Sequence, residues 1–164
     1  LERNDLGRVC RYGSVKVDDL MAMEEYSHVI HIVSNVRGRL RDGARLPELF
    51  AAAFPGGTIS GCPKVRSLEI IDALEPVRRQ LYTGSMGYIS VTREMDFNIL
   101  IRTGFVRGGQ VAIQAGAGIV ADSDPGREYE ETLHKARALR EVFEGEALAK
   151  APRRRSVHPE LVER

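Results

Sequence analysis

Tryptophan is absent from this sequence, and cysteine occurs only as Cys10 and Cys62. Two cysteines are too few for a disulfide framework, and they lack the spacing of metal ligands. We therefore interpret both as reduced thiols, as is typical of a cytoplasmic protein. The sequence also has no signal peptide pattern and no apolar run near the roughly 18 residues that a membrane span requires. It thus predicts a cytoplasmic protein that does not cross a membrane.

An excess of charge of one sign is missing as well. The 164 residues include 24 basic and 23 acidic side chains, which gives a formal net charge of +1. This balance argues against a protein that works by neutralising nucleic-acid phosphates. Apolar residues make up 43% of the chain, enough for the core of one domain.

A glycine-rich segment, FPGGTISGCPKVR at residues 54–66, is the most informative local feature. Its glycines let a ligand approach the main-chain N–H groups, and Pro63 suits the first turn of a helix. The apolar residues that follow keep helical spacing as far as the Glu-Pro pair at 75–76. The start of such a helix can bind a carboxylate or a phosphate. A nucleotide-binding P-loop is excluded, because Gly61 is not followed by Lys and Ser or Thr.

The rest of the pattern predicts a mixture of strands and helices. We expect strands at 15–17, 26–36, 81–91, 97–105 and 111–114, and helices at 46–54 and 127–143. Gly108 and Gly109 mark a hairpin turn between the last two strands. The fold class is therefore α+β, with antiparallel sheets packed with helices.

Two polar residues fall within apolar strand patterns. Arg102 lies in the middle of the predicted strand at 97–105, where a guanidinium needs a carboxylate or a similar partner. A structural ion pair and a ligand-binding role are both open for it. His31 shares a face with Val29 and Val33 in the predicted strand at 26–36. Such a histidine is either a core residue or a candidate for catalysis.

The final predicted helix carries charges on its apolar side. With about 100° per residue, Glu128, Glu131 and Lys135 project into the same arc as the apolar stripe. Two carboxylates one turn apart, with a lysine a turn further on, can hold a divalent cation and an anionic substrate together. A buried salt-bridge network is the alternative. The opposite arc holds other charged residues, namely Glu130, Arg137 and Glu141.

Five segments together carry a resemblance to a known family. They are GGTISGCPKVRSLEIIDALEP, YTGSMGYIS, DFNILIRT, QAGAGIVADSDP and EYEETLHKA. In this order they resemble the chorismate-utilising enzymes, the family of aminodeoxychorismate synthase component I and anthranilate synthase component I. The resemblance implies the anthranilate synthase component I-like fold, with residues 1–144 as the C-terminal part of a chorismate-binding domain. Residues 145–164 are expected to form a disordered basic tail.

The resemblance also implies how chorismate is bound. Thr58 and the backbone around Gly118 match positions that bind the carboxylates of chorismate. Tyr82 and Arg102 match the pair that holds the enolpyruvyl carboxylate, a task that suits a bidentate guanidinium. Lys135 matches the cation that faces the ring carboxylate.

The catalytic and metal-binding residues implied by the resemblance lie mostly on the last helix. Glu128 matches a ligand of Mg²⁺, and Glu131 a second acidic group beside the metal. His31 matches a histidine near the reacting ring, a candidate for proton transfer, so His31, Glu131 and Lys135 form the implied catalytic set.

The implied reaction is the Mg²⁺-dependent amination of chorismate to 4-amino-4-deoxychorismate on the folate and para-aminobenzoate pathway. Ammonia would come from a glutamine amidotransferase partner. Segments 54–57 and 95–98 favour this reaction, whereas 114–118 and 129–132 are compatible with anthranilate synthase, an enzyme of tryptophan biosynthesis. That alternative stays open, as does a truncated, non-catalytic binding module.

The chain opens on Leu1 rather than Met, and we expect a fragment that lacks the N-terminal part of the domain. The family places another metal-binding glutamate and, in aminodeoxychorismate synthases, a ring-attacking lysine in that part. The fragment alone is therefore expected to be inactive and to expose apolar sheet surface.

Overall fold

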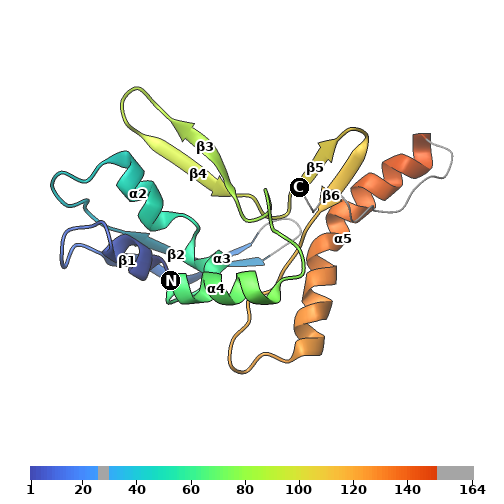
Figure 1. The fold of residues 1–164 in the computed structure, drawn as a ribbon, viewed down its shortest axis with the longest axis horizontal. Coiled ribbons are helices and arrows are strands. Elements are labelled where there is room, and N and C mark those ends of the chain that lie inside the picture. The colour runs from blue at the N-terminus through green and yellow to red at the C-terminus, as the bar shows by residue number, and fades with distance from the viewer. Residues whose placement is uncertain (26–29, 151–164) are drawn as a thin grey trace. The chain divides into compact units, whose positions relative to one another are not determined.

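A computed structural model of the chain describes residues 1–25 and 30–150, without the side chains of 25, 30, 31 and 146–150. Within these residues, helices are combined with three separate two-stranded antiparallel sheets, which confirms the α+β class. The chain divides into two compact units, Leu1–Ala73 and Leu74–Arg164. Each unit is described by itself, and the elements are labelled in Figure 1.

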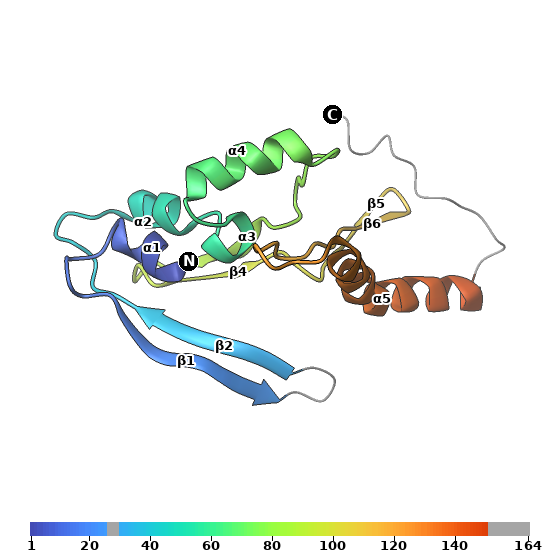
Figure 2. The same ribbon diagram turned by 90° about the horizontal axis from the view of Figure 1, so that it is seen from below.

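The first unit combines one long hairpin with short helices. Strand β1 pairs with β2 from Lys16↔Arg37 to Glu25↔Ile30, with register shifts on either side of Asp19. Figure 2 shows the helices on one side of this hairpin. The elements are α1 (Glu2–Gly7), β1 (Lys16–Glu25), β2 (Ile30–Arg37), α2 (Leu46–Ala53), α3 (Gly57–Ser60) and α4 (Lys64–Leu74). The predicted helices at 46–54 and after Pro63 are confirmed by α2 and α4.

The second unit contains two hairpins and the longest helix. Its elements are β3 (Ser85–Ile89), β4 (Met95–Ile99), β5 (Gly104–Arg107), β6 (Gln110–Ile113) and α5 (Pro125–Lys150). Gly108 and Gly109 make the predicted turn between β5 and β6, with φ of 57° and 76°, a conformation that glycine adopts at little cost. The hairpin packs on α5, because a Cβ placed on Gly104 would lie 2.7 Å from Cε2 of Phe143.

Two predictions about the second unit were wrong in extent. The expected strand at 97–105 is broken between β4 and β5, and Arg102 lies in the connecting loop, exposed, with φ of 49°. The pairing ends in a bulge at Leu100, whose N–H donates to Gly84 O and whose carbonyl accepts from Thr83 N, both at 2.9 Å, and Ile101 N then bonds back to Ile99 O. The expected tail at 145–164 begins as helix, since α5 continues to Lys150, and residues 151–164 lie outside the described residues.

The described residues bury fewer apolar side chains than the composition indicates. Val9, Ala52 and Leu100 form the buried apolar set, while Leu20, Met23 and Ile32 on the β1–β2 hairpin are 73%, 73% and 66% exposed. A two-stranded ribbon has no neighbouring strands to widen its apolar face, so these side chains stay open. The expectation of exposed apolar sheet surface is confirmed. None of the described helices is both long and apolar enough to cross a membrane.

Candidate functional site

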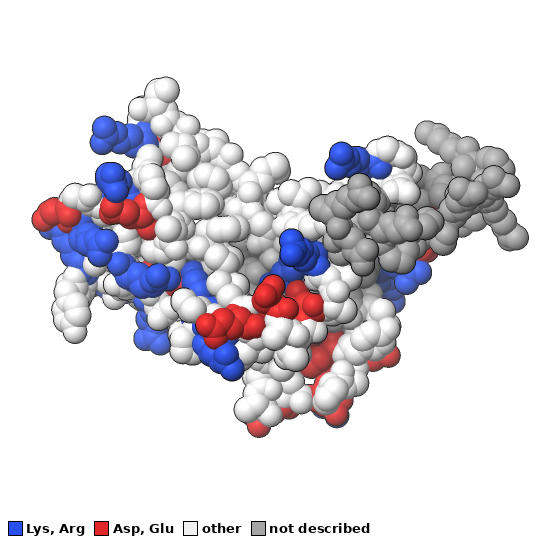
Figure 3. Space-filling model, in the orientation of Figure 1, with Lys and Arg blue, Asp and Glu red and all other residues white. Residues whose placement is uncertain are grey.

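The beginning of α5 is fixed by a short turn that carries polar side chains. Asp124 caps the helix, because its Oδ1 accepts a hydrogen bond from Arg127 N at 2.9 Å, and Pro125 occupies the first helical position. Before the cap, Ser123 Oγ accepts from Val120 N at 3.0 Å. This turn places the Ser123 hydroxyl beside the first turn of α5. Figure 3 shows acidic side chains on the surface of the region where α5 begins.

Glu128 is held by this turn and keeps one oxygen without a partner. Ser123 Oγ donates to Glu128 Oε1 at 2.6 Å. Glu128 Oε2 is buried and accepts no hydrogen bond within the part of the chain that the structure describes. A buried carboxylate oxygen without a donor is costly, and a cation beside it would offset that cost.

Lys135 and Glu131 form an ion pair one turn further along the helix. Lys135 Nζ lies 2.6 Å from Glu131 Oε1 and donates to Gly116 O at 3.2 Å. The hydrogen bond from Lys135, and then its charge, lower the pKa of Glu131, and the Glu128 carboxyl contributes a smaller lowering as a hydrogen-bonding neighbour. The Lys135 ammonium is therefore paired with Glu131, and Glu128 lies one turn before Glu131 on the same helix.

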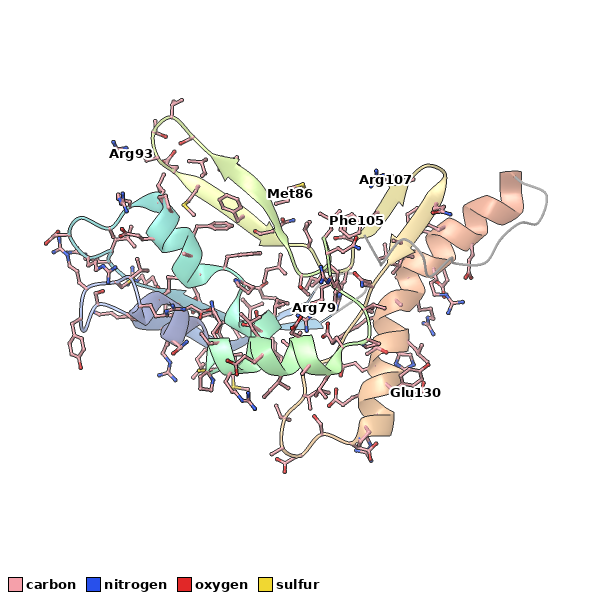
Figure 4. The ribbon with its side chains drawn as sticks, in the orientation of Figure 1. Arg79, Met86, Arg93, Phe105, Arg107 and Glu130 are labelled. Carbon is pink, nitrogen blue, oxygen red and sulfur yellow. The ribbon has the colours of Figure 1, made fainter. Side chains whose placement is uncertain are left out.

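Burial along α5 follows one face of the helix. Glu128 and Lys135 are half-buried on the face that includes Thr132, Leu139 and Phe143, as the helical spacing predicted. Glu131 lies at the edge of this face, with 51% of its side chain exposed. Glu130 projects from the same helix and is exposed (Figure 4).

The Tyr82 hydroxyl lies near Gly116, the residue whose carbonyl accepts from Lys135. A Cβ placed on Gly116 would lie 2.9 Å from the Tyr82 hydroxyl oxygen, so a larger residue there would push the phenol aside. Burial raises the pKa of Tyr82, with the nearby Arg79 charge opposing it, and the phenol stays protonated at neutral pH. Arg79, labelled in Figure 4, donates hydrogen bonds to both carboxylate oxygens of Glu75 at 2.6 to 3.1 Å.

The other predicted residues of this unit are placed less firmly. Arg102 is exposed, and no carboxylate pairs with it within residues 1–25 and 30–150. The structural ion pair, one of the two alternatives for Arg102, is thus not found among them. Gly118 is exposed, with open space around its Cα. The carbonyl that contacts Lys135 belongs to Gly116, a residue that sequence reasoning passed over.

The first unit holds the two remaining predicted residues. Thr58 is the second residue of α3 and is exposed. His31 lies in β2, where its backbone is paired with Glu24, and its side chain lies outside the described residues. The structure describes each unit by itself, so these two are not placed against the cluster on α5.

Beneath Thr58 lies a buried charged pair that sequence reasoning missed. Asp5 Oδ1 and Lys64 Nζ are 2.9 Å apart, with 7% and 6% of their side chains exposed. Asp5 Oδ2 accepts a hydrogen bond from Gly57 N at 2.8 Å, and Lys64 Nζ donates to Ala52 O at 3.0 Å. No local pattern in the sequence marks Asp5, because its partners lie far along the chain.

The α5 carboxylates offer some of the ligands that a hard cation requires. Glu128 Oε2 offers a buried, unused oxygen, and Glu131 lies beside it. Carboxylate oxygens are the ligands that Mg²⁺ prefers, and Mg²⁺ commonly takes only one or two of them and keeps several waters. No group of three His, Cys, Asp or Glu side chains suited to a metal occurs in the described part of the chain. The set is therefore a two-carboxylate site.

Comparison with known proteins gives the family. Residues 1–141 match the family described as chorismate binding enzyme. This chain belongs to that family, as the resemblance predicted. Among curated proteins, aminodeoxychorismate synthase component 1 of Bacillus subtilis (strain 168) is 57% identical over 144 residues, which cover 88% of this chain and 31% of that protein. An anthranilate synthase component I-like protein of Synechocystis sp. is 59% identical over 145 residues, covering 88% and 30%.

Solved structures confirm the fold. Anthranilate synthase component I from Streptococcus pneumoniae TIGR4 superposes with a TM-score of 0.76 at 41% identity, covering 84% of this chain and 32% of that one. A protein described as a 2,3-dihydroxybenzoate-specific isochorismate synthase from Bacillus anthracis gives 0.73 at 25% identity, covering 86% and 37%. The chain thus spans about a third of the length of the relatives that it matches.

Proposed function

We propose that this chain provides part of the chorismate site of an enzyme that aminates chorismate to 4-amino-4-deoxychorismate. The observation that carries the proposal is the cluster on α5, where Lys135 bridges Gly116 O and Glu131 while Glu128 keeps a buried oxygen unused. Membership of the chorismate binding enzyme family makes chorismate, a dicarboxylate, the ligand that these charges would receive.

Cationic and hydroxyl groups would bind the substrate. Lys135 is 32% exposed and can turn from Glu131 to a carboxylate on the ring. The protonated Tyr82 hydroxyl and the Arg102 guanidinium can donate to the enolpyruvyl carboxylate, since Arg102 is exposed and Tyr82 stays neutral. Thr58 and the open backbone at Gly118 would add hydrogen bonds to the carboxylates.

Magnesium is part of this proposal. Glu128 and Glu131 would hold the ion, which would supply positive charge to the substrate as its ring hydroxyl leaves. Ser123 keeps Glu128 in its rotamer through the 2.6 Å hydrogen bond, and Lys135 limits the negative charge of the pair. His31 is proposed as a proton carrier near the ring. Ammonia, delivered by a glutamine amidotransferase partner, would replace the hydroxyl, and water would leave.

Anthranilate synthase is the second candidate, because relatives of that name reach 54% identity over 144 residues. The two reactions differ in their products. Amination alone yields 4-amino-4-deoxychorismate and water, which keeps the enolpyruvyl group. Formation of anthranilate also releases that group as pyruvate.

The deciding experiment uses the protein as its gene encodes it, supplied with chorismate, an ammonium salt and Mg²⁺. Consumption of chorismate without pyruvate release, with 4-amino-4-deoxychorismate found by mass spectrometry, is the expected result. Pyruvate and anthranilate in equal amounts would assign the second candidate. If chorismate is neither consumed nor bound in calorimetric titration, with or without Mg²⁺, the proposed function is wrong.

A further inference from the structure

The buried pair of Asp5 and Lys64 joins four helices of the first unit. Asp5 belongs to α1 and accepts from the first residue of α3, Gly57, at 2.8 Å. Lys64 is the first residue of α4 and donates to Ala52 in α2 at 3.0 Å. The 2.9 Å contact between the two side chains closes the connection. Each charged group thus also bonds one backbone group, Gly57 N–H or Ala52 C=O, on either side of the glycine-rich segment.

Gly57 is pressed against α1 at this point. A Cβ on Gly57 would lie 3.0 Å from Asp5 Oδ2 and 3.1 Å from Leu1 Cβ, so a larger residue would displace the segment. Ser60, at the other end of α3, is buried and donates to Gly56 O at 3.0 Å. Between these two anchors Thr58 is exposed. The buried residues Gly57 and Ser60 therefore fix the backbone of α3 and with it the direction of the Thr58 side chain.

We propose that Asp5, held in place by Lys64, is a positioning residue for Thr58. Its carboxylate fixes Gly57 N–H and so sets the backbone from which Thr58 reaches the substrate. An apolar pair of similar volume would fill the same space and is often as stabilising as a buried ion pair. It would leave Gly57 N–H and Ala52 C=O without partners, however. What Thr58 binds rests on the proposed function, but the positioning of α3 does not.

The test compares two double variants that both remove the buried charges. Asp5→Asn/Lys64→Met keeps an acceptor for Gly57 N–H, whereas Asp5→Leu/Lys64→Met removes it. We expect the leucine variant to speed amide hydrogen exchange across residues 57–60 by about tenfold, the value of one hydrogen bond of roughly 1.4 kcal/mol. KM for chorismate is expected to rise by about the same factor with kcat little changed, because a ground-state contact is lost. The asparagine variant should show a much smaller rise in the exchange rate of residues 57–60 and in KM.

Two further variants separate positioning from general stability. Arg66→Ala removes an exposed ion pair on the same helix α4 and is the matched control, with no expected change at residues 57–60. Gly57→Ala keeps both charges paired but pushes the segment away from Asp5, and should raise KM even if the leucine variant does not fold. Combining Gly57→Ala with Thr58→Val should give little further rise in KM over Thr58→Val alone, since both act through one contact.

The outcomes decide the two proposals separately. Equal exchange at residues 57–60 in the two double variants, or an unchanged KM in Gly57→Ala, would overturn the positioning role. A protein that does not consume chorismate would overturn the proposed function, while faster exchange in the leucine variant would still support the positioning of α3.

Discussion

The two units each contain a lysine paired with a carboxylate, and the pairs differ in burial. Lys64 and Asp5 are 6% and 7% exposed, and each also bonds a buried backbone group. Lys135 and Glu131 are 32% and 51% exposed, and Lys135 also donates to Gly116 O, close to the Tyr82 hydroxyl. The first pair is closed off from solvent, whereas the second is open to it. The surroundings rather than the chemistry of the two side chains therefore separate the structural pair from the candidate site.

The largest expected effect comes from breaking the buried pair on one side. Lys64→Met leaves the Asp5 carboxylate buried without a counter-charge and should lower the free energy of unfolding by roughly 3–5 kcal/mol. Urea denaturation measures this. Arg66→Ala, which removes a pair with 69% and 57% exposed side chains, should cost less than about 1 kcal/mol. Equal losses for the two variants would mean that the Asp5–Lys64 pair is not desolvated.

The converse prediction concerns the exposed pair. Lys135→Met should reduce kcat/KM for chorismate by about a hundredfold, roughly 2.7 kcal/mol, because a carboxylate of the substrate loses its cation. The thermal midpoint should change less than for Lys64→Met, because Lys135 is only half-buried and Glu131 is exposed. Arg137→Met, which removes an exposed pair with Glu141 on the same helix, is the control and should leave turnover unchanged. Retained activity in Lys135→Met would remove α5 from the substrate site.

A smaller effect is expected from the residue that orients Glu128. Ser123→Ala deletes the 2.6 Å hydrogen bond to Glu128 and should weaken Mg²⁺ binding by about tenfold, the lower end for a lost supporting contact. Titration of Mg²⁺ by calorimetry measures this in the protein as its gene encodes it. Ser90→Ala in the exposed β3–β4 turn is the matched control. If both serine variants bind Mg²⁺ equally, Glu128 does not serve as a supported ligand.

The two lysine–carboxylate pairs also differ in how far the sequence could predict them, because one lies within a single helix and the other joins distant parts of the chain. Helical spacing placed Glu128 and Lys135 on the half-buried face of α5, because a helix fixes side-chain direction within a few residues. Arg102 was misplaced, because alternation continues through residues 97–105 although the regular pairing stops at a bulge, where Leu100 lies opposite Thr83 and Gly84. The Asp5–Lys64 pair was invisible, since it depends on contacts between residues far apart in the sequence. The local sequence pattern thus predicts which face of a helix is buried. The point where a strand ends and the partners in a buried ion pair depend on tertiary contacts instead.

The smallest expected effect is electrostatic and tests whether Lys135 really faces Glu131. The pKa of Glu131 is lowered from its usual value, first by the hydrogen bond from Lys135 and then by its charge. A depressed pKa in the folded state adds stability above the pKa of the unfolded chain, and this is lost as the pH falls through the folded pKa. Because Glu131 is exposed, the change in stability should be slight and confined to acid.

An NMR titration of the Glu131 side chain can observe this directly. Lys135→Met should move its pKa upward, since both leading causes of the lowering are removed while the Glu128 carboxyl stays. Chorismate should act in the same direction if it draws Lys135 away from Glu131, whereas Mg²⁺ bound by the two carboxylates should keep the pKa low. An unchanged pKa in Lys135→Met would show that the ion pair on α5 does not form in solution, and the contrast between the two lysines would then rest on Lys64 alone.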